Sequence, residues 1–228
     1  LGPRQGFPHT PMLPHNMAMT VTGAGMLWVG WFGFNGGSAL AAGGAAAMAM
    51  LVTHISAAAG ACAWTAIEWY QYRKPSALGV VTGMVAGLGT ITPASGTVGP
   101  GGALLIGLIA GSVCFAATHL MKRVFKVDDS LDVFPVHGVG GITGTLLTGV
   151  FTSSTLGAFS GAGYAAGQTM GGQFAVQALG VISTGLYTAL VTLALLKLVG
   201  ALTPLRVSTE QEHAGLDITE HNETGYNS

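Results

Sequence analysis

The chain has 228 residues, of which 7% are charged and 50% are hydrophobic, and its formal net charge is -1. An average soluble domain carries about 25% charged residues, so these charges are too few to cover a water-facing surface. Lipid is therefore the expected solvent for much of the chain, and the many glycines suit closely packed membrane helices. Nucleic acid is excluded as a partner, because no basic patch is present to neutralise phosphates.

Six apolar segments predict membrane spans, each of which needs about 20 mainly apolar residues. In chain order they cover residues 17–39, 45–70, 76–90, 103–121, 133–151 and 169–202. The third is short and rich in glycine. The sixth is too long for a perpendicular span, so it should tilt or project beyond the bilayer. The predicted fold is an all-α, polytopic membrane helix bundle.

The basic residues fall before the first span, on two alternate connections, and at the end of the last span. They are Arg4, Arg73, Lys74, Lys122, Arg123, Lys126, Lys197 and Arg206. The other connections, residues 40–44, 91–102 and 152–168, contain no charged residue. Cytoplasmic loops carry an excess of Lys and Arg. The alternation therefore supports six spans and predicts that both ends of the chain are cytoplasmic.

Two parts are expected, a transmembrane domain over residues 1–202 and a cytoplasmic tail over residues 203–228. The tail is polar and mostly acidic, and we expect it to be partly ordered at best. The chain begins at Leu1 without the features of a signal peptide, so we interpret it as part of a longer protein.

Cys62 and Cys114 lie alone in apolar stretches and are expected to be small buried residues. The sequence contains no HExxH, no CxxC and no glycine-rich loop followed by a lysine. It therefore predicts no metal site, no cofactor and no enzyme activity.

His137 lies inside the fifth predicted span, in the segment 132–141. An imidazole in the hydrocarbon region is costly unless it faces a cavity or a polar partner. Two interpretations stay open: a histidine that faces a pathway for a solute, and a structural histidine bonded to a neighbouring helix. Pro135 should kink or break the helix just before it. His54 is expected to be a packing histidine, and His119 an interfacial one.

Acidic residues open the fifth span. Asp128 or Asp129 could cap this helix and complement its dipole. Asp132 lies further in and is expected to lock loops or helices together at the inner mouth of the bundle. Glu68 lies near the inner end of the second span, where an ion pair with Arg73 is expected.

The segment 30–38, GWFGFNGGS, ends the first span with aromatic residues. Trp31 and Phe34 could belong to an ordinary aromatic belt. The glycines together with Asn35 and Ser38 are unusual for a lipid-facing belt. Aromatic faces attract cations, and a nearby hydroxyl can accept a hydrogen bond from an N–H donor. A cage for a small cation is the alternative interpretation.

Four motifs together resemble the ammonium transporter family, the Amt/Mep/Rh proteins, and most closely its bacterial Amt branch. They are GWFGFNGGS (30–38), ITPASG (91–96), VDDSLDVFPVHG (127–138) and LRVSTEQEHAGLD (205–217). The resemblance implies eleven spans, of which the first ten form two inverted five-helix repeats. This chain would hold spans six to eleven of a homotrimer with one pore per subunit.

The resemblance also implies site residues. His137 is similar to one of two paired pore histidines, Phe34 to a gate phenylalanine, and Leu27 to an apolar residue of the pore wall. Trp31 and Ser38 are similar to residues that recruit ammonium on the outer side, and Thr92 to a threonine at the outer mouth. Asp129 and Asp132 take structural positions at the inner mouth. The second histidine would lie in the missing half, so these residues alone should not conduct.

The implied function is a channel in the plasma (inner) membrane that binds ammonium, deprotonates it and conducts ammonia. The tail resembles the segment that docks a PII-type signal protein, although an ordinary solvated tail would look similar. Two rivals stay open. One is an ammonium sensor, and the other is a channel for a different small solute such as carbon dioxide or methylamine.

Overall fold

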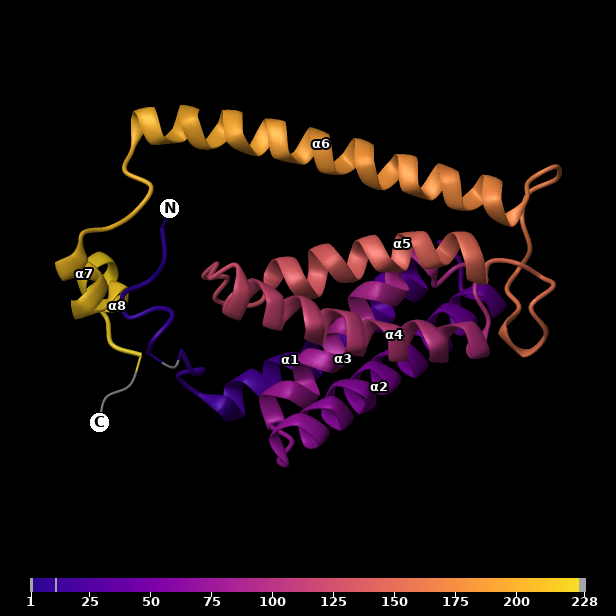
Figure 1. The fold of residues 1–228 in the computed structure, drawn as a ribbon, viewed down its shortest axis with the longest axis horizontal. Helices are drawn as coiled ribbons and strands as arrows, with labels where there is room; N and C mark the ends of the chain where they lie inside the picture. The colour runs from indigo at the N-terminus through magenta and orange to yellow at the C-terminus, as the bar shows by residue number, and fades with distance from the viewer. Residues whose placement is uncertain (1, 11, 226–228) are drawn as a thin grey trace. The chain divides into compact units, whose positions relative to one another are not determined.

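The computed structural model describes residues 2–10 and 12–225 (Figure 1). They form two compact units, residues 3–182 in one and Gly2 with residues 183–225 in the other. Every regular element within the described ranges is helical. The prediction of an all-α fold is therefore confirmed.

Six longer helices follow the predicted spans closely. They are α1 (Met17–Gly37), α2 (Gly44–Tyr72), α3 (Ala77–Ile91), α4 (Pro100–His119), α5 (Val139–Phe151) and α6 (Met170–Leu202). Short helical turns extend three of them: η1 (Thr92–Ala94) follows α3, η2 (Leu120–Val124) follows α4, and η3 (Phe134–Gly138) leads into α5. A further turn, η4 (Gly157–Phe159), lies between α5 and α6, and the tail holds α7 (Thr209–Ala214) and α8 (Leu216–His221).

Five helical segments of the described chain are long and apolar enough to cross a membrane. They are Met17–Gly37, Gly44–Tyr72, Ala77–Ala94, Pro100–Val124 and Met170–Leu202. The fifth predicted span, residues 133–151, is also helical, but its α-helical part has only 13 residues. Its first turn is the π-helical η3, which contains Pro135. Proline lacks an N–H and is tolerated in a first turn, so Pro135 lies at the beginning of this helix and does not break its middle.

Glycines bring α2 against both α3 and α4 at backbone distance. A Cβ added at Gly87 of α3 would overlap the carbonyl of Ser56, and one added at Gly107 of α4 would overlap the same carbonyl. Gly60 on α2 lies equally close to the carbonyl of Gly83. The hydroxyl of Ser56 also donates to the carbonyl of Gly87 at 2.9 Å. Small residues let apolar helices gain dispersion contacts and interhelical hydrogen bonds without a hydrophobic driving force.

The helix α5 packs on α3 and α4 in the same way. A Cβ at Gly144 would overlap the carbonyl of Thr90, and one at Gly140 would lie 2.9 Å from the Thr90 hydroxyl and 3.3 Å from the Cys114 sulfur. Cys114 is buried at this junction, as expected. The matching expectation for Cys62 is wrong, because Cys62 lies on an exposed part of α2.

The two units divide inside α6, which has no buried residue among those described. The tail in the second unit contains two short helices. Ser208 begins α7 with a reciprocal capping box, in which its side chain accepts from the Gln211 N–H and the Gln211 side chain accepts from the Ser208 N–H. Gln211 also donates to Glu220 of α8 at 3.0 Å, and Arg206 pairs with Glu212 at 2.8 Å.

The contact between α3 and α5 predicts that only one of two glycines a helical turn apart tolerates alanine. Gly144→Ala should destabilise the protein by about 1–3 kcal/mol, because the added methyl group overlaps the Thr90 backbone. Gly141→Ala is the control, because a Cβ there meets nothing within 4 Å. The shift of the unfolding midpoint in detergent measures both. Equal shifts would contradict the packing described here.

Candidate functional site

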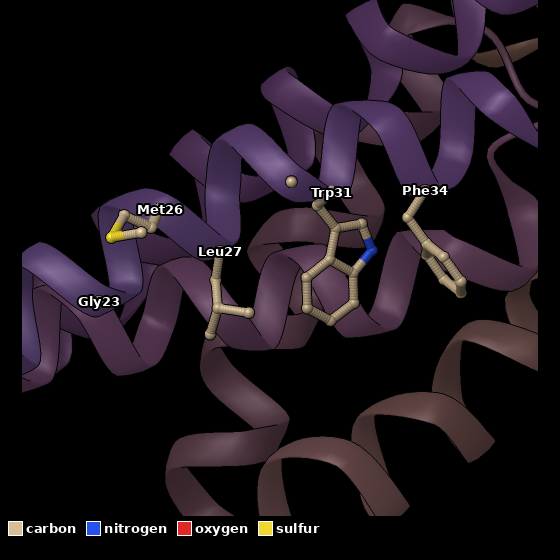
Figure 2. Close-up of a pocket in the computed structure, with 6 residues that line it drawn as sticks. Gly23, Met26, Leu27, Trp31 and Phe34 are labelled. Carbon is tan, nitrogen blue, oxygen red and sulfur yellow. The ribbon is translucent and has the colours of Figure 1, made fainter.

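One face of α1 carries an exposed apolar groove (Figure 2). Its volume is about 570 Å³, and it is lined by Gly23, Met26, Leu27, Gly30, Trp31 and Phe34. Leu27 is 53% exposed and Phe34 is 59% exposed. The helical period places these residues on one face. Gly23 and Gly30 have no side chain, so they leave space above the helix. Three predicted site residues therefore share one surface.

Trp31 connects this groove to the end of α3. Its indole Nε1 donates to the Thr92 hydroxyl at 2.7 Å, and that hydroxyl donates in turn to the Leu88 carbonyl at 2.7 Å. The Trp31 and Phe34 rings lie nearly perpendicular, with centroids 6.0 Å apart. The structure thus brings Trp31, Phe34 and Thr92 together, although their sequence positions span two helices.

Ser38 and Asn35 contribute differently from what the aromatic motif suggested. The Ser38 hydroxyl donates to the Phe34 carbonyl at 2.7 Å and so caps the end of α1, with its oxygen still able to accept a hydrogen bond. Asn35 is buried against α2, where its amide donates to the Thr53 hydroxyl at 2.9 Å. The Asn35 side chain therefore holds α1 on α2 and does not face lipid.

His137 lies in η3 and is exposed in a second cleft of about 570 Å³. Leu27 lines the same cleft from α1, and Val81 and Val85 line it from α3. The Nδ1 atom of His137 lies 3.8 Å from the position that a Cβ on Gly89 would take. The ring makes no hydrogen bond with any residue of the described ranges, and the role of His137 in a solute pathway stays a prediction.

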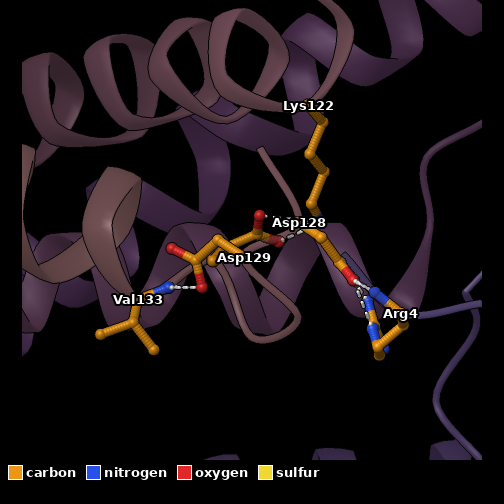
Figure 3. A network of polar contacts seen from close by, with 6 residues as sticks. Arg4, Lys122, Asp128, Asp129 and Val133 are labelled. Carbon is orange, nitrogen blue, oxygen red and sulfur yellow. Dashed lines mark hydrogen bonds and ion pairs between the residues drawn. The ribbon is translucent and has the colours of Figure 1, made fainter. Parts of the chain in front are cut away.

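Charged residues line the part of this cleft where α4 ends and η3 begins (Figure 3). Arg4 holds Asp128 with two side-chain hydrogen bonds, from Nε at 2.9 Å and from the guanidinium NH2 group at 2.7 Å. These bonds hold the pKa of Asp128 below its usual value. The Lys122 Nζ lies 2.8 Å from Asp132. Burial raises the pKa of Asp132, and the lysine charge opposes that rise.

Asp129 is the residue that caps the helix of the fifth segment. Its Oδ1 accepts from the Val133 N–H at 3.0 Å and its Oδ2 from the Phe134 N–H at 2.7 Å. Of the two capping candidates, Asp128 instead pairs with Arg4. The expectation that Asp132 locks elements together agrees with its ion pair to Lys122, which joins η2 to the residues just before η3. Asp129 and Asp132 thus hold the start of the helical segment that carries His137.

Glu68 does not form the expected ion pair with Arg73. It accepts from the Ser76 N–H at 2.8 Å and from the Trp64 indole at 3.2 Å, and so ties the turn between α2 and α3. Arg73 ends α2 in the left-handed conformation, with φ of 63°. The main chain therefore turns after the last helical residue, and the N–H and the hydroxyl of Ser76 both donate to the Glu68 carboxylate.

The other two histidines of the spans lie outside both grooves. His54 packs on the Trp28 ring with centroids 5.1 Å apart, but its side chain stays exposed. His119, at the end of α4, is half-buried. Neither lines the cleft that contains His137.

Long apolar helices that contact one another at glycines define a multi-pass helical membrane protein. The model of the Ammonium Transporter Family matches residues 1–226, and the chain belongs to this family. It is 42% identical over 226 residues to the ammonium transporter Amt1 of Archaeoglobus fulgidus, covering 99% of this chain and 56% of that protein. It is 40% identical over 217 residues to an ammonium transporter of Bacillus subtilis, covering 95% of this chain and 53% of that protein.

Two solved structures share the fold. The structure titled "Sensor Amt Protein" matches with a TM-score of 0.85 and 30% identity, covering 96% of this chain and 54% of that one. Mep2 of Saccharomyces cerevisiae matches with a TM-score of 0.74 and 34% identity, covering 84% and 46%. The chain therefore spans about half the length of its relatives, as expected for one portion of the ammonium transporter fold.

The bond between Trp31 and Thr92 predicts a coupled effect on stability. Trp31→Phe and Thr92→Val each remove the same hydrogen bond. The double variant should therefore lose less free energy of unfolding than the two single variants lose together. The expected coupling is about 0.5–1.5 kcal/mol. Unfolding midpoints of the four proteins in detergent give this energy. Strictly additive losses of unfolding free energy would contradict an energetic coupling between Trp31 and Thr92.

Proposed function

We propose that the intact protein carrying this chain conducts ammonium across a membrane. The observation that carries the proposal is His137, an exposed imidazole without a hydrogen-bond partner in the described chain, in a cleft that Leu27 and Val85 also line. A histidine at membrane depth marks a pathway for a solute or proton. Membership of the Ammonium Transporter Family makes ammonium the best-supported solute.

Selectivity in this proposal comes from acid–base chemistry. Ammonium binds in an outer cage that includes Trp31, Phe34 and Ser38, where aromatic faces attract the cation. It then separates into ammonia and a proton, because the apolar pore beyond the cage disfavours charge. Potassium has no proton to release and is rejected.

His137 receives the ammonia in the proposed pore. A neutral imidazole offers one N–H donor and one acceptor nitrogen, which orient ammonia or relay the proton. A second histidine from outside this chain completes the pair. Leu27 lies on the wall that leads to it, and the Thr92 hydroxyl positions the Trp31 indole at the outer mouth.

The charge pattern supports a topology for the intact protein. Residues 1–202 form its transmembrane domain, and the basic connections place both ends in the cytoplasm. The proposed location is the plasma (inner) membrane, and the proposed assembly is a homotrimer. Residues 203–228 are then a cytoplasmic regulatory tail, whose helices α7 and α8 offer an ordered surface to a PII-type protein.

An ammonium sensor is the second candidate, because one structure with 30% identity is titled "Sensor Amt Protein". A sensor and a transporter share the cage and differ in flux. Growth of a transport-deficient strain on low ammonium separates them. Rescue supports the transporter, and no rescue by a protein that reaches the membrane supports the sensor.

His137→Ala should lower ammonium flux in proteoliposomes on the order of tenfold or more, because the proton relay and the ammonia contact disappear together. His54→Ala is the matched control, an exposed histidine of a membrane helix outside the cleft. Ammonium and potassium fluxes are measured side by side. Undiminished ammonium flux with potassium still excluded would overturn the role of His137.

A further inference from the structure

Four exposed basic side chains lie just beyond the ends of α2 and α4. They are Arg73, Lys74, Arg123 and Lys126. None of the four has a carboxylate within ion-pair distance among the described residues. Their positive charges are therefore available to an anion from outside the chain.

The ends of α2 and α4 lie side by side. The offset in sequence between the two helices is the same at three successive contacts one turn apart, which are Ser56 with Gly107, Gly60 with Gly111, and Trp64 with Phe115. Helices that keep a constant offset run in the same direction. Tyr72, the last residue of α2, still lies against Phe115 of α4, with ring centroids 6.5 Å apart. The continuation of α4 into η2 therefore brings Arg123 to the level of the turn that holds Arg73.

The acidic residues at this end of the two helices do not cancel the basic ones. Glu68 and Asp129 accept hydrogen bonds from uncharged donors, and Asp128 and Asp132 form the ion pairs with Arg4 and Lys122. Six basic residues thus stand against four acidic residues, all four of them already engaged. An excess of positive charge remains, and it is carried by exposed side chains.

Exposed aromatic rings accompany the charges. Trp69 and Tyr70 are exposed in the last turn of α2, and Phe125 is exposed just after η2. With 29 residues and a rise of 1.5 Å per residue, α2 is longer than a hydrocarbon core of about 30 Å. Its aromatic end therefore reaches the headgroup region, where Trp and Tyr are enriched. A ligand that fits both features has an anionic group beside an apolar part.

We propose that this basic surface, formed by Trp69, Tyr70, Arg73, Lys74, Arg123 and Lys126, binds the headgroup of an anionic phospholipid. The guanidinium and ammonium groups contact the lipid phosphate, for which guanidinium offers two parallel N–H donors. The aromatic rings lie against the glycerol and the upper acyl chains. On the proposed topology the surface faces the cytoplasmic leaflet, which carries the anionic lipids. The inference does not depend on which solute the intact protein carries.

Lipid binding to the intact protein in micelles of an uncharged detergent tests the proposal. The protein is titrated with phosphatidylglycerol or with phosphatidylcholine, and the wild type should bind phosphatidylglycerol at least tenfold more tightly. A double variant with Arg73→Gln and Lys74→Gln should bind phosphatidylglycerol about tenfold more weakly, because two charges near the phosphate are lost. A second double variant, with Arg123→Gln and Lys126→Gln, should show the same loss. Binding of phosphatidylcholine should change in neither.

Lys197→Gln is the matched control, because Lys197 is an exposed basic residue of α6 with no ion pair among the described residues. It should leave the affinity for phosphatidylglycerol within about twofold. Unfolding midpoints should not change in any variant, since no ion pair is lost, and they identify a variant that fails to fold. The second double variant then carries the test.

Two results would overturn the proposal. One is an undiminished preference for phosphatidylglycerol in the folded double variants, or an equal loss in Lys197→Gln, which would reflect net charge alone. The other is displacement of the lipid by inorganic phosphate at the same concentration, which would indicate a site for a free anion. Loss confined to the double variants, with no displacement by phosphate, supports the lipid site.

Discussion

Direct backbone contact between helices is the constraint on which the larger unit depends. Apolar helices in lipid gain little from burying side chains against one another, so close approach has to supply the contact energy. Gly60, Gly87 and Gly107 supply it around α2, where any side chain would overlap a neighbouring carbonyl. The same contact at Gly144 fixes α5 beside Thr90, one residue after Gly89, which borders the His137 ring. The glycine contacts between the helices therefore determine the shape of the cleft.

Polar contacts then set the direction from which His137 enters the cleft. Asp129 satisfies the first free N–H groups of the helical segment, and Pro135 needs none in its first turn. Lys122 and Asp132 join this start to the end of α4. The three neighbouring acids thus have different roles. Asp128 pairs with Arg4, Asp129 caps the helical segment, and Asp132 pairs with Lys122 in the lining of the cleft.

The sequence predicted the helices well, because composition and charge alternation depend on the chain alone. The fifth span was harder. Its apolar length suggested an ordinary span, whereas the strained Asp132 and the π-helical turn leave a short α-helix. Helix propensity carries no signal for such a turn.

Contacts between helices were less predictable than the helices themselves. The expected ion pair of Glu68 with Arg73 was wrong, and the bond from Asn35 to Thr53 was not predicted, because no local spacing reveals a partner on another element. The exposure of Cys62 was also missed, because α2 packs through a face that includes Gly60, Val52 and Trp64 and leaves Cys62 outside it. His137, Trp31 and Thr92 were identified through motifs, and the bond between the last two emerged only in three dimensions.

Cysteine reactivity along α1 tests most directly whether its exposed groove borders a solute pathway. Leu27 lines the groove, and Val29, 70% exposed, lies two positions on, on the opposite face of the helix. With Cys62 replaced by Ser, Leu27→Cys and Val29→Cys are treated with a small water-soluble thiol reagent in membranes. The account predicts rapid modification at position 27 with loss of ammonium flux, and slow modification without loss at position 29. Equal reactivity at the two positions would contradict it.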